Sequence, residues 1–453
     1  MKAVRILLLS TYELGRQPFG LASPAAWLKA AGHEVTPADL SCSPLPVQAV
    51  EQADLIAFFL PMHTATRLFL RVVERVRAVN SWAHLCAYGL YAPLNAGFLY
   101  RAGVKTIIGG EFEQPLVDLA QRLEAGGHGA GSGGYVEPLV SLARQQFLTP
   151  DRTGLPALAA YAHLVVNGAT RVVGYTEASR GCKHLCRHCP VAPVYRGTFR
   201  IVQPEVVLED VRRQVAAGAQ HITFGDPDFF NGPAHGARIV TALHREWPWL
   251  TYDVTIKIEH LLNHCELLPV LKATGCQFVT SAVESLDDAV LEKLAKGHTR
   301  AAFLKALALT RASGLPLAPT FIPFTPWTTR EYYRWFLREL VDLDLIDQVA
   351  PIQLAIRLLI PEGSLLLEMP EIRGMVEPFD PRALCYPWRN PDPKVDMLHV
   401  SIQELIKREE RHHAGRAQIF RMIWDLAEGG AFPEGTPRPS RATIPYLTEP
   451  WYC

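Results

Sequence analysis

The chain has 453 residues, and its 45 lysines and arginines balance its 45 aspartates and glutamates, so the formal net charge is zero. This balance excludes a general attraction to nucleic acid or to an anionic membrane, and no apolar stretch approaches the about 18 residues that a membrane helix needs. The length predicts two or three domains. The apolar run at the N-terminus is too short for a secretory signal, so we expect a cytoplasmic protein with no nucleic-acid or membrane partner.

Residues 1–125 predict an α/β domain with a doubly wound parallel sheet, because apolar strand-like runs alternate with amphipathic stretches at 25–31 and 68–79. The expected strands are 4–9, 33–36, 55–60, 84–88 and 105–108. Loops at the carboxyl ends of such strands form a ligand crevice. This half resembles the cobalamin-binding domain that precedes many radical S-adenosylmethionine (SAM) barrels, but it lacks the Asp-x-His-x-x-Gly motif whose histidine would bind cobalt. The resemblance implies either bound cobalamin or a domain that only caps the barrel.

Residues 126–170 are expected to link this domain to the next one. The glycine-rich run at 126–134 predicts a flexible hinge or a surface turn, since it is too short and irregular for a phosphate-binding loop.

Three cysteines with the spacing C-x₃-C-x₂-C follow a short strand-like run at 172–175. Cys182, Cys186 and Cys189 would place three thiolates on one loop, and soft sulfur ligands are typical of iron–sulfur sites. The motif resembles that of the radical SAM superfamily. The resemblance implies a 4Fe-4S cluster with one open iron that binds SAM, and a one-electron reductant such as flavodoxin or ferredoxin. A zinc site formed by the three cysteines with His184 or His188 is the alternative.

Residues 171–380 predict a partial (β/α)6 barrel. The expected strands are 172–175, 221–224, 252–258, 277–283, 315–322 and 353–359. The family resemblance implies that strand-end side chains bind SAM: Asp226 and Asp228 at its ammonium group, and Glu284 and Ser285 near its ribose and carboxylate. Either aspartate could instead form an Asx turn.

Two further residues of the barrel are candidates for binding SAM. Lys257 ends the third expected strand, where alternating polar side chains point into the barrel. Arg357 lies on the sixth expected strand, and a charge inside a barrel needs a partner. That partner would be the SAM carboxylate or a carboxylate of the barrel itself.

Residues 381–453 are expected to form a mostly helical extension, with a helical segment at 399–426, and a tail that ends at Cys453. The tail resembles that of the CUAEP/CCAEP-tail radical SAM proteins, where a cysteine is followed by selenocysteine or a second cysteine. The resemblance implies that Cys453 is catalytic and that the reading frame continues through a selenocysteine codon. The resulting pair would act as a redox couple or bind a soft substrate.

These features together predict a radical SAM enzyme of specialised metabolism that acts on a small molecule or a peptide. One alternative is transfer of the 3-amino-3-carboxypropyl group of SAM to a soft nucleophile such as a thiol or arsenite, and another is cobalamin-dependent methyl transfer. A metal-cluster or zinc-binding regulator without turnover is the non-enzymatic alternative.

Overall fold

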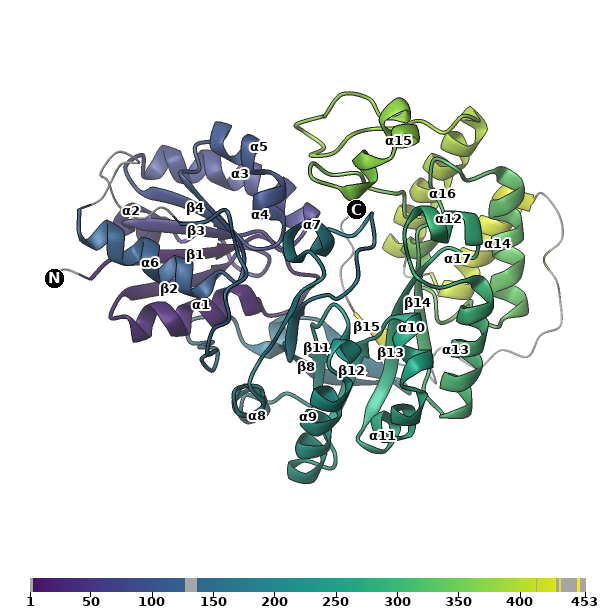
Figure 1. The fold of residues 1–453 in the computed structure, drawn as a ribbon, viewed down its shortest axis with the longest axis horizontal. Helices are drawn as coiled ribbons and strands as arrows, with labels where there is room; N and C mark the ends of the chain where they lie inside the picture. Colours follow the sequence, from purple (N-terminus) through teal and green to yellow (C-terminus); the bar gives the residue numbers. More distant parts are fainter. Residues whose placement is uncertain (1–2, 127–136, 413, 429–431, 433–445, 449–453) are drawn as a thin grey trace.

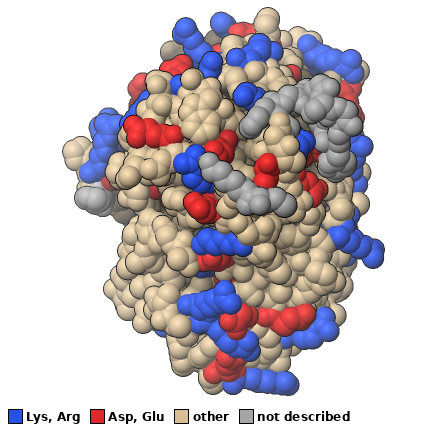
Figure 2. Space-filling model, turned by 90° about the vertical axis from the view of Figure 1, so that its left-hand side faces the viewer, with Lys and Arg blue, Asp and Glu red and all other residues tan. Residues whose placement is uncertain are grey.

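The computed structural model describes residues 3–126, 137–412, 414–428, 432 and 446–448. Two β-sheets, each with its own helices, lie next to each other, and helices from the C-terminal part of the chain pack against the second sheet (Figure 1). In the described part of the chain, no helix is long and apolar enough to cross a membrane. Figure 2 shows positive and negative side chains interspersed on one face of the molecule, consistent with the zero net charge.

The N-terminal sheet is parallel throughout, with the strand order β2-β1-β3-β4-β5-β6. Its strands are β1 (Arg5–Ser10), β2 (Glu34–Asp39), β3 (Leu55–Phe59), β4 (His84–Tyr88), β5 (Thr106–Gly110) and β6 (Val140–Ser141). Its helices are α1 (Phe19–Ala30), α2 (Val47–Gln52), α3 (His63–Val79), α4 (Tyr91–Leu94), α5 (Ala96–Arg101) and α6 (Glu113–Glu124). Alternate residues of β1 enter different apolar clusters: Leu7 packs on the face covered by α3, and Leu8 on the face covered by α1 and α6. The sheet is therefore covered on both faces, as predicted for a doubly wound fold.

The second sheet has the strand order β14-β13-β12-β11-β8-β7-β15 and curls into a half-barrel. Its parallel strands are β8 (Ala169–Thr176), β11 (His221–Phe224), β12 (Thr251–Thr255), β13 (Cys276–Glu284) and β14 (Leu317–Phe321). Two strands, β7 (His163–Val166) and β15 (Tyr446–Leu447), extend one edge in antiparallel pairing. The connecting helices are α8 (Pro204–Ala216), α9 (Pro233–Glu246), α10 (Ile258–Asn263), α11 (Leu268–Ala273), α12 (Asp288–Lys293), α13 (Arg300–Ala312) and α14 (Arg330–Asp342).

Two of the expected barrel strands differ from the prediction. The third ends at Thr255, because Lys257 is already the N-cap of α10. The sixth expected strand, at 353–359, is wrong as a continuous strand: the chain forms the 3₁₀ helix η4 (Pro351–Leu354) and then makes a single parallel bridge between Arg357 and Phe324. The Gln353 side chain accepts a hydrogen bond from the Phe321 N–H, which occupies a donor that a neighbouring strand would otherwise bind.

A small antiparallel pair, β9 (Ser179–Gly181) and β10 (Phe199–Ile201), encloses the cysteine motif and the short helix α7 (Val191–Tyr195). Val191, Val194 and Tyr195 of α7 pack into an apolar cluster of the N-terminal sheet, and Figure 1 shows α7 between the two sheets. The segment that carries the cysteines is therefore held by both halves of the molecule.

The C-terminal part of the chain covers the barrel. Its elements are η5 (Leu365–Glu368), α15 (Pro370–Met375), α16 (Pro393–Arg411) and α17 (Arg416–Glu428), while η1 (Leu158–Ala160) precedes the barrel. The single helical segment expected at 399–426 is therefore two helices, because α16 ends at Arg411 and α17 begins at Arg416. Ile402 of α16 and Phe420 of α17 are buried in the apolar core of the barrel.

Candidate active site

The cysteine loop begins directly after β9, at the carboxyl end of the parallel strand β8. Gly181 has a φ of +75°, and a Cβ atom there would lie 2.4 Å from the Tyr195 ring and 2.6 Å from the Thr198 carbonyl oxygen. Only glycine fits this turn. The backbone N–H of Cys182 then donates to the Thr198 carbonyl at 3.1 Å, which fixes the start of the loop.

The donor set of this loop fits an iron–sulfur cluster. Burial raises the pKa of the Cys182 thiol and raises that of Cys189 to about 12, while the backbone N–H groups of His184 and Val191 donate hydrogen bonds to the two sulfur atoms and oppose the rise. Hydrogen bonds of this kind stabilise thiolate ligands.

The spacing of the sulfur atoms argues against the zinc alternative. A zinc ion with bonds of about 2.3 Å to sulfur would hold its sulfur ligands within about 4.6 Å of one another. In the described part of the chain, the compact set of possible ligand atoms, all within 4.8 Å of one another, does not include the cysteines. As they stand, the three cysteines do not form a set as compact as one zinc ion requires.

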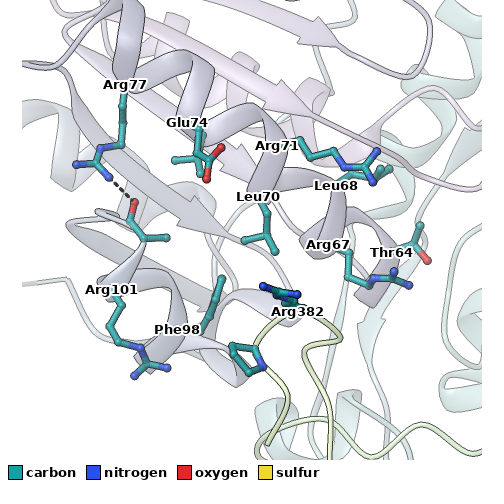
Figure 3. Close-up of a pocket in the computed structure, with 13 residues that line it drawn as sticks. Thr64, Arg67, Leu68, Leu70, Arg71, Glu74, Arg77, Phe98, Arg101 and Arg382 are labelled. Atoms are coloured by element: carbon teal, nitrogen blue, oxygen red, sulfur yellow. Dashed lines mark hydrogen bonds between the residues drawn. The ribbon is translucent and has the colours of Figure 1, made fainter.

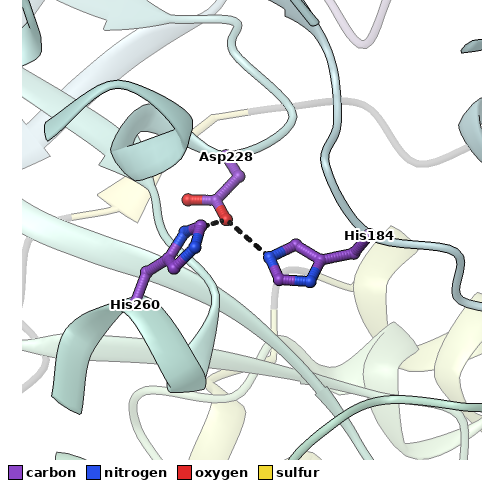
Figure 4. Close-up of side chains that lie close together, drawn as sticks. All are labelled: His184, Asp228 and His260. Carbon is purple, nitrogen blue, oxygen red and sulfur yellow. Dashed lines mark ion pairs between the residues drawn. The ribbon is translucent and has the colours of Figure 1, made fainter. Parts of the chain in front are cut away.

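That compact set consists of His184, Asp228 and His260, which we call the mouth cluster (Figure 4). Asp228 Oδ2 lies 2.7 Å from His260 Nδ1 and 3.8 Å from His184 Nε2. The other oxygen, Asp228 Oδ1, accepts the Phe230 N–H and starts the 3₁₀ helix η2 (Phe229–Asn231), so the carboxylate is fixed. Burial, together with the charges of Lys257 and His260, lowers the pKa of His184 to about 4.

Glu284 lies at the carboxyl end of β13, where the register against β14 shifts. Its φ of +68° is unusual for a residue other than glycine, and such conformations gather at functional sites. The carboxylate lies 3.1 Å from His188 Nε2 and 3.4 Å from Lys296 Nζ. Burial alone would raise the pKa of Glu284, but Lys296 and His188 lower it to about 2. Glu284 is therefore ionised at neutral pH.

Two more buried side chains that can carry a charge lie at this end of the barrel. Lys257 is buried and its Nζ atom is 3.4 Å from Glu259 Oε2. His298 is also buried, and neither of its ring nitrogens has a hydrogen-bond partner among the described residues. Burial and the charges of Lys296 and Lys257 lower the pKa of His298 to about 4, so its imidazole is neutral at physiological pH.

Asp226 and Ser285 are engaged by neighbouring protein groups. The Asp226 carboxylate accepts the Ala178 N–H at 2.9 Å and the Ser179 hydroxyl at 2.5 Å, and burial raises its pKa to about 6. Ser285 Oγ lies 2.8 Å from the Tyr332 hydroxyl. Asp226 thus anchors the segment before the cysteine loop, while contact of either residue with SAM stays a prediction.

Arg357 was expected to line the barrel and bind an anion there. In the structure its guanidinium is bound by other parts of the protein. Its guanidinium is 2.7 Å from Asp396 of α16, donates to the Trp388 carbonyl and lies 3.6 Å from the centre of the Trp388 ring. The expected partner of Arg357 was either the SAM carboxylate or a carboxylate of the barrel. The structure shows a protein carboxylate, but it belongs to the C-terminal extension and not to the barrel. Cys453 lies outside the described residues.

A second buried charged group, which we call the junction cluster, joins the two sheets. Arg180 of β9 contacts Glu113 at 2.7 Å, Glu111 at 3.4 Å and Glu177 at 2.7 Å, and the Ser23 hydroxyl lies 3.4 Å from the guanidinium. The rings of Phe19, Phe112 and Phe147 surround the guanidinium. Burial raises the pKa of Glu177 to about 7 despite the charge of Arg180. This cluster fastens the loops after β5 to the segment that leads into the cysteines.

Two cavities share part of their walls, and the one at the junction between the sheets adjoins the cysteine loop. A cavity of about 220 Å³ lies at the junction between the sheets, where Gly181 and Pro227 are part of its wall. A cavity of about 300 Å³ lies inside the barrel and is lined by threonines of β11, β12, β13 and β14. Leu14, Arg16 and Gly225 border both cavities. Asp226, which lines the barrel cavity, also accepts hydrogen bonds from Ala178 and Ser179, shortly before the cysteine loop.

A third cavity, of about 790 Å³, lies on the N-terminal half between α3, α5 and residues 381–382 (Figure 3). Five exposed arginines border it: Arg67, Arg71, Arg77, Arg101 and Arg382. Glu74 is the acidic residue on its wall. Such a surface attracts anionic groups.

Sequence reasoning did not single out His260, Lys296 or Arg180. Each lies in a segment whose local pattern is ordinary, and each gains its role only from contacts with distant residues. The only sequence feature that could have indicated them is their position: His260 and Lys296 follow the ends of strands, and Arg180 directly precedes the cysteine motif. Parallel α/β folds place ligand sites at such strand ends.

Comparison with known proteins agrees with this geometry. Residues 176–339, which include the three cysteines, match the family model described as Radical SAM superfamily. The chain is 28% identical over 156 residues to a hopanoid C-3 methylase of Methylococcus capsulatus, covering 34% of this chain and 30% of that protein. It is 29% identical over 198 residues to a tRNA-2-methylthio-N(6)-dimethylallyladenosine synthase of Desulfosudis oleivorans, covering 39% and 38%. The matches thus span about a third of these relatives.

Two solved structures share the fold over most of the chain. One is the cobalamin-dependent SAM radical enzyme OxsB with aqua-cobalamin bound, with a TM-score of 0.71 at 14% identity over 94% of this chain and 72% of that one. The other is the radical SAM methyltransferase TsrM of Kitasatospora setae, with tryptophan and a SAM analogue bound. Its TM-score is 0.64 at 16% identity, over 81% of this chain and 76% of that one.

Proposed function

We propose that this chain, whose residues 176–339 match the Radical SAM superfamily model, is an enzyme that cleaves SAM reductively to modify a small molecule or a peptide. The observation that carries the proposal is the cysteine loop after β9, with one cavity beside it and a second cavity in the barrel that shares wall residues with the first. A regulator would need no such cavity next to its metal site. The family match supports the same chemistry.

The residues present fit a 4Fe-4S cluster, with Cys182, Cys186 and Cys189 as its ligands. When bound, the cluster supplies one electron for breaking a carbon–sulfur bond of SAM, which starts radical chemistry on the substrate. The protein contributes charge and shape. The ionised carboxylate of Glu284 would accept hydrogen bonds from SAM, and α7 with the N-terminal sheet covers the site and limits the access of water.

The barrel cavity supports a small substrate. Its polar lining includes threonines of four strands, Thr223, Thr255, Thr280 and Thr320, together with Asp253 and Gln353. Asp253 already accepts from the Thr223 hydroxyl at 2.6 Å and lies 2.9 Å from His221 Nε2, so it is held in place. Because the remaining wall is mainly apolar, with Phe224 and Phe278 among its residues, the cavity favours a ligand with both apolar parts and hydrogen-bonding groups, such as a small molecule or the end of a peptide.

The arginine-lined cavity supports the electron donor. We propose that an acidic flavodoxin or ferredoxin docks there, because charge complementarity speeds the association of such proteins. A series of residue contacts leads from this cavity toward the cysteine loop. Arg382 precedes Ala383, whose carbonyl oxygen lies 2.7 Å from His63 Nε2. The His63 ring in turn lies 6.3 Å from the Tyr91 ring. Tyr91 lies near Cys189, whose charge adds to the effect of burial in raising the Tyr91 pKa. Exchanging Arg67 and Arg71 for glutamate should then slow turnover with a flavodoxin and leave turnover with dithionite unchanged.

Cobalamin-dependent methyl transfer is a second candidate, supported by the shared fold with OxsB and TsrM. The junction cavity does not fit the cofactor as it stands. At about 220 Å³ it is smaller than most pockets for drug-sized ligands, and cobalamin is larger than these. Phe59, Phe112 and Arg180 are among the residues that border it.

Transfer of the 3-amino-3-carboxypropyl group of SAM is a third candidate, and one observation favours it. Tyr446 and Leu447, which form β15 shortly before Cys453, border the barrel cavity. We propose that Cys453 is the nucleophile that receives this group or a ligand for the soft substrate. The selenocysteine continuation is tested by reading the genomic frame beyond codon 453: an in-frame Ala-Glu-Pro supports it, and a stop codon followed by noncoding sequence contradicts it.

The deciding experiment is mass spectrometry of the products after anaerobic cluster reconstitution and incubation with SAM and a one-electron reductant. Accumulation of 5′-deoxyadenosine supports reductive cleavage. Methylthioadenosine indicates aminocarboxypropyl transfer, and S-adenosylhomocysteine indicates methyl transfer. If SAM stays intact in the reconstituted protein, with and without candidate substrates, the enzymatic proposal fails. A Cys186→Ala variant is the control: it measures how much SAM the reductant cleaves without an intact cluster.

A further inference from the structure

We propose that the mouth cluster, His184, Asp228 and His260, binds a divalent transition-metal ion that is separate from the cysteine-bound cluster. The three ligand atoms come from three segments: the cysteine loop, the loop after β11, and helix α10. Figure 4 shows both imidazoles directed at the same carboxylate oxygen. The inference goes beyond the proposed function, because the ion would be a resident metal that takes no part in SAM cleavage.

Burial is the first argument for a bound ion. Asp228 is 1% exposed and His260 is 7% exposed. The three converging atoms, Asp228 Oδ2, His260 Nδ1 and His184 Nε2, have no hydrogen-bond partner among the described residues. Leaving a buried polar atom unsatisfied costs about 1–3 kcal/mol, and more for a charged group. A shared cation would satisfy all three atoms at once.

Distances are the second argument. A tetrahedral ion with bonds of about 2.1 Å to nitrogen and oxygen holds its ligand atoms about 3.4 Å apart. The two measured separations from Asp228 Oδ2, 2.7 Å and 3.8 Å, lie on either side of this value. The atoms 2.7 Å apart do not form a regular hydrogen bond. Small rotations of the two rings would therefore complete the coordination.

The surroundings of His184 are the third argument. Its other ring nitrogen, Nδ1, lies 3.8 Å from Glu259 Oε2. Histidine ligands of metals usually present their second nitrogen to a carboxylate, which fixes the ring and raises its basicity. Glu259 also contacts Lys257 at 3.4 Å, which offsets the charge of this lysine near the site.

The donor set defines the class of metal. Two imidazoles and one carboxylate bind Zn²⁺, and with open positions they also bind Fe²⁺. Hard ions such as Mg²⁺ and Ca²⁺ prefer oxygen ligands. Because His184 lies between Cys182 and Cys186, the ion would tie the cysteine loop to the barrel. Asp228 would then serve this ion, and the ammonium of SAM would need another acceptor.

The test measures zinc and iron separately in the reconstituted protein. Wild type, Asp228→Asn and His260→Asn are incubated with one equivalent of Zn²⁺, desalted and analysed for zinc, iron and sulfide. We expect about one zinc per chain in the wild type and a loss of most of it in both variants, with iron and sulfide unchanged. His264→Asn is the matched control, because this ring lies 5.9 Å from that of His260 but outside the cluster. It should retain both metals.

Two further measurements separate this site from the cysteines. Cys186→Ser should lose iron and keep zinc, so a failure of cluster binding is distinguishable from a failure of the zinc site. X-ray absorption at the zinc edge should show nitrogen and oxygen neighbours near 2.0–2.1 Å. A sulfur shell near 2.3 Å, equal zinc retention in His260→Asn, or no zinc in the wild type would each overturn the proposal.

Discussion

The junction cluster and the mouth cluster are both buried and charged, yet they differ in how completely their groups are paired. In the junction cluster, every nitrogen of the Arg180 guanidinium faces a carboxylate or hydroxyl oxygen. In the mouth cluster, the three converging atoms lack hydrogen-bond partners among the described residues. A buried charge whose hydrogen bonds are all made holds the structure together, whereas buried groups that converge without hydrogen bonds are placed for a ligand. Substitutions in the two regions should therefore fail in different ways.

The largest effect is expected at the cysteine loop beside the mouth cluster. Cys186→Ala removes one of three cluster ligands, so we expect the cluster absorbance to disappear and SAM cleavage to fall to the background of the reductant. The change should leave the thermal unfolding of the apoprotein nearly unaltered. Cys42→Ala is the matched control, because Cys42 is an exposed thiol of the N-terminal half. Retention of a full cluster in Cys186→Ala would contradict the assignment.

The next largest effect is expected at the junction cluster, on stability. Arg180→Met leaves the buried Glu111 and Glu113 and the partly buried Glu177 without their cation, so the free energy of unfolding should fall by about 3–5 kcal/mol. Urea unfolding measures this change. Arg212→Met provides the contrast, because its exposed ion pairs with Glu209 of α8 and Glu246 of α9 should be worth about 0–1 kcal/mol. Equal losses of unfolding free energy in the two variants would contradict a structural role of the junction cluster.

The junction cluster should also respond to pH. Because its pKa is raised from 4.5 to about 7, the folded protein holds a proton on Glu177 that the unfolded chain has released. This contribution is fully present below about pH 4.5 and is lost as the pH rises toward 7.

Glu177→Gln should therefore stabilise the protein at pH 8 by about 1–3 kcal/mol and have little effect at pH 4. Denaturation at both pH values measures the difference. A gain of the same size at pH 4 and pH 8 would show that the carboxyl does not titrate in this range.

The smallest effect is expected at Arg357. Its pair with Asp396 is partly exposed and its guanidinium lies over Trp388, so Arg357→Gln should cost about 1 kcal/mol. The KM for SAM should stay within twofold of the wild type, since the guanidinium already has protein partners. A large rise of this KM with unchanged stability would restore Arg357 as the site of the SAM carboxylate.

The sequence alone determined the features that depend on neighbours along the chain. Alternating apolar runs predicted the strands of the N-terminal sheet, because buried parallel strands leave a local apolar pattern. The cysteine spacing predicted a ligand loop after β8, because all three ligands lie within eight residues of one segment. The absence of the sixth strand could not be predicted in this way. The segment at 353–359 is apolar enough for a strand, but the chain begins it with the end of a 3₁₀ helix.

Only the tertiary structure decided which polar residues meet. Asp226 and Asp228 are two positions apart, yet one anchors the backbone before the cysteine loop and the other faces two imidazoles. Arg180 and Glu113, like His188 and Glu284, are neighbours only because strands from distant parts of the chain end at the same place. Such meetings depend on strand order, register and side-chain direction, and no local pattern of residues encodes them.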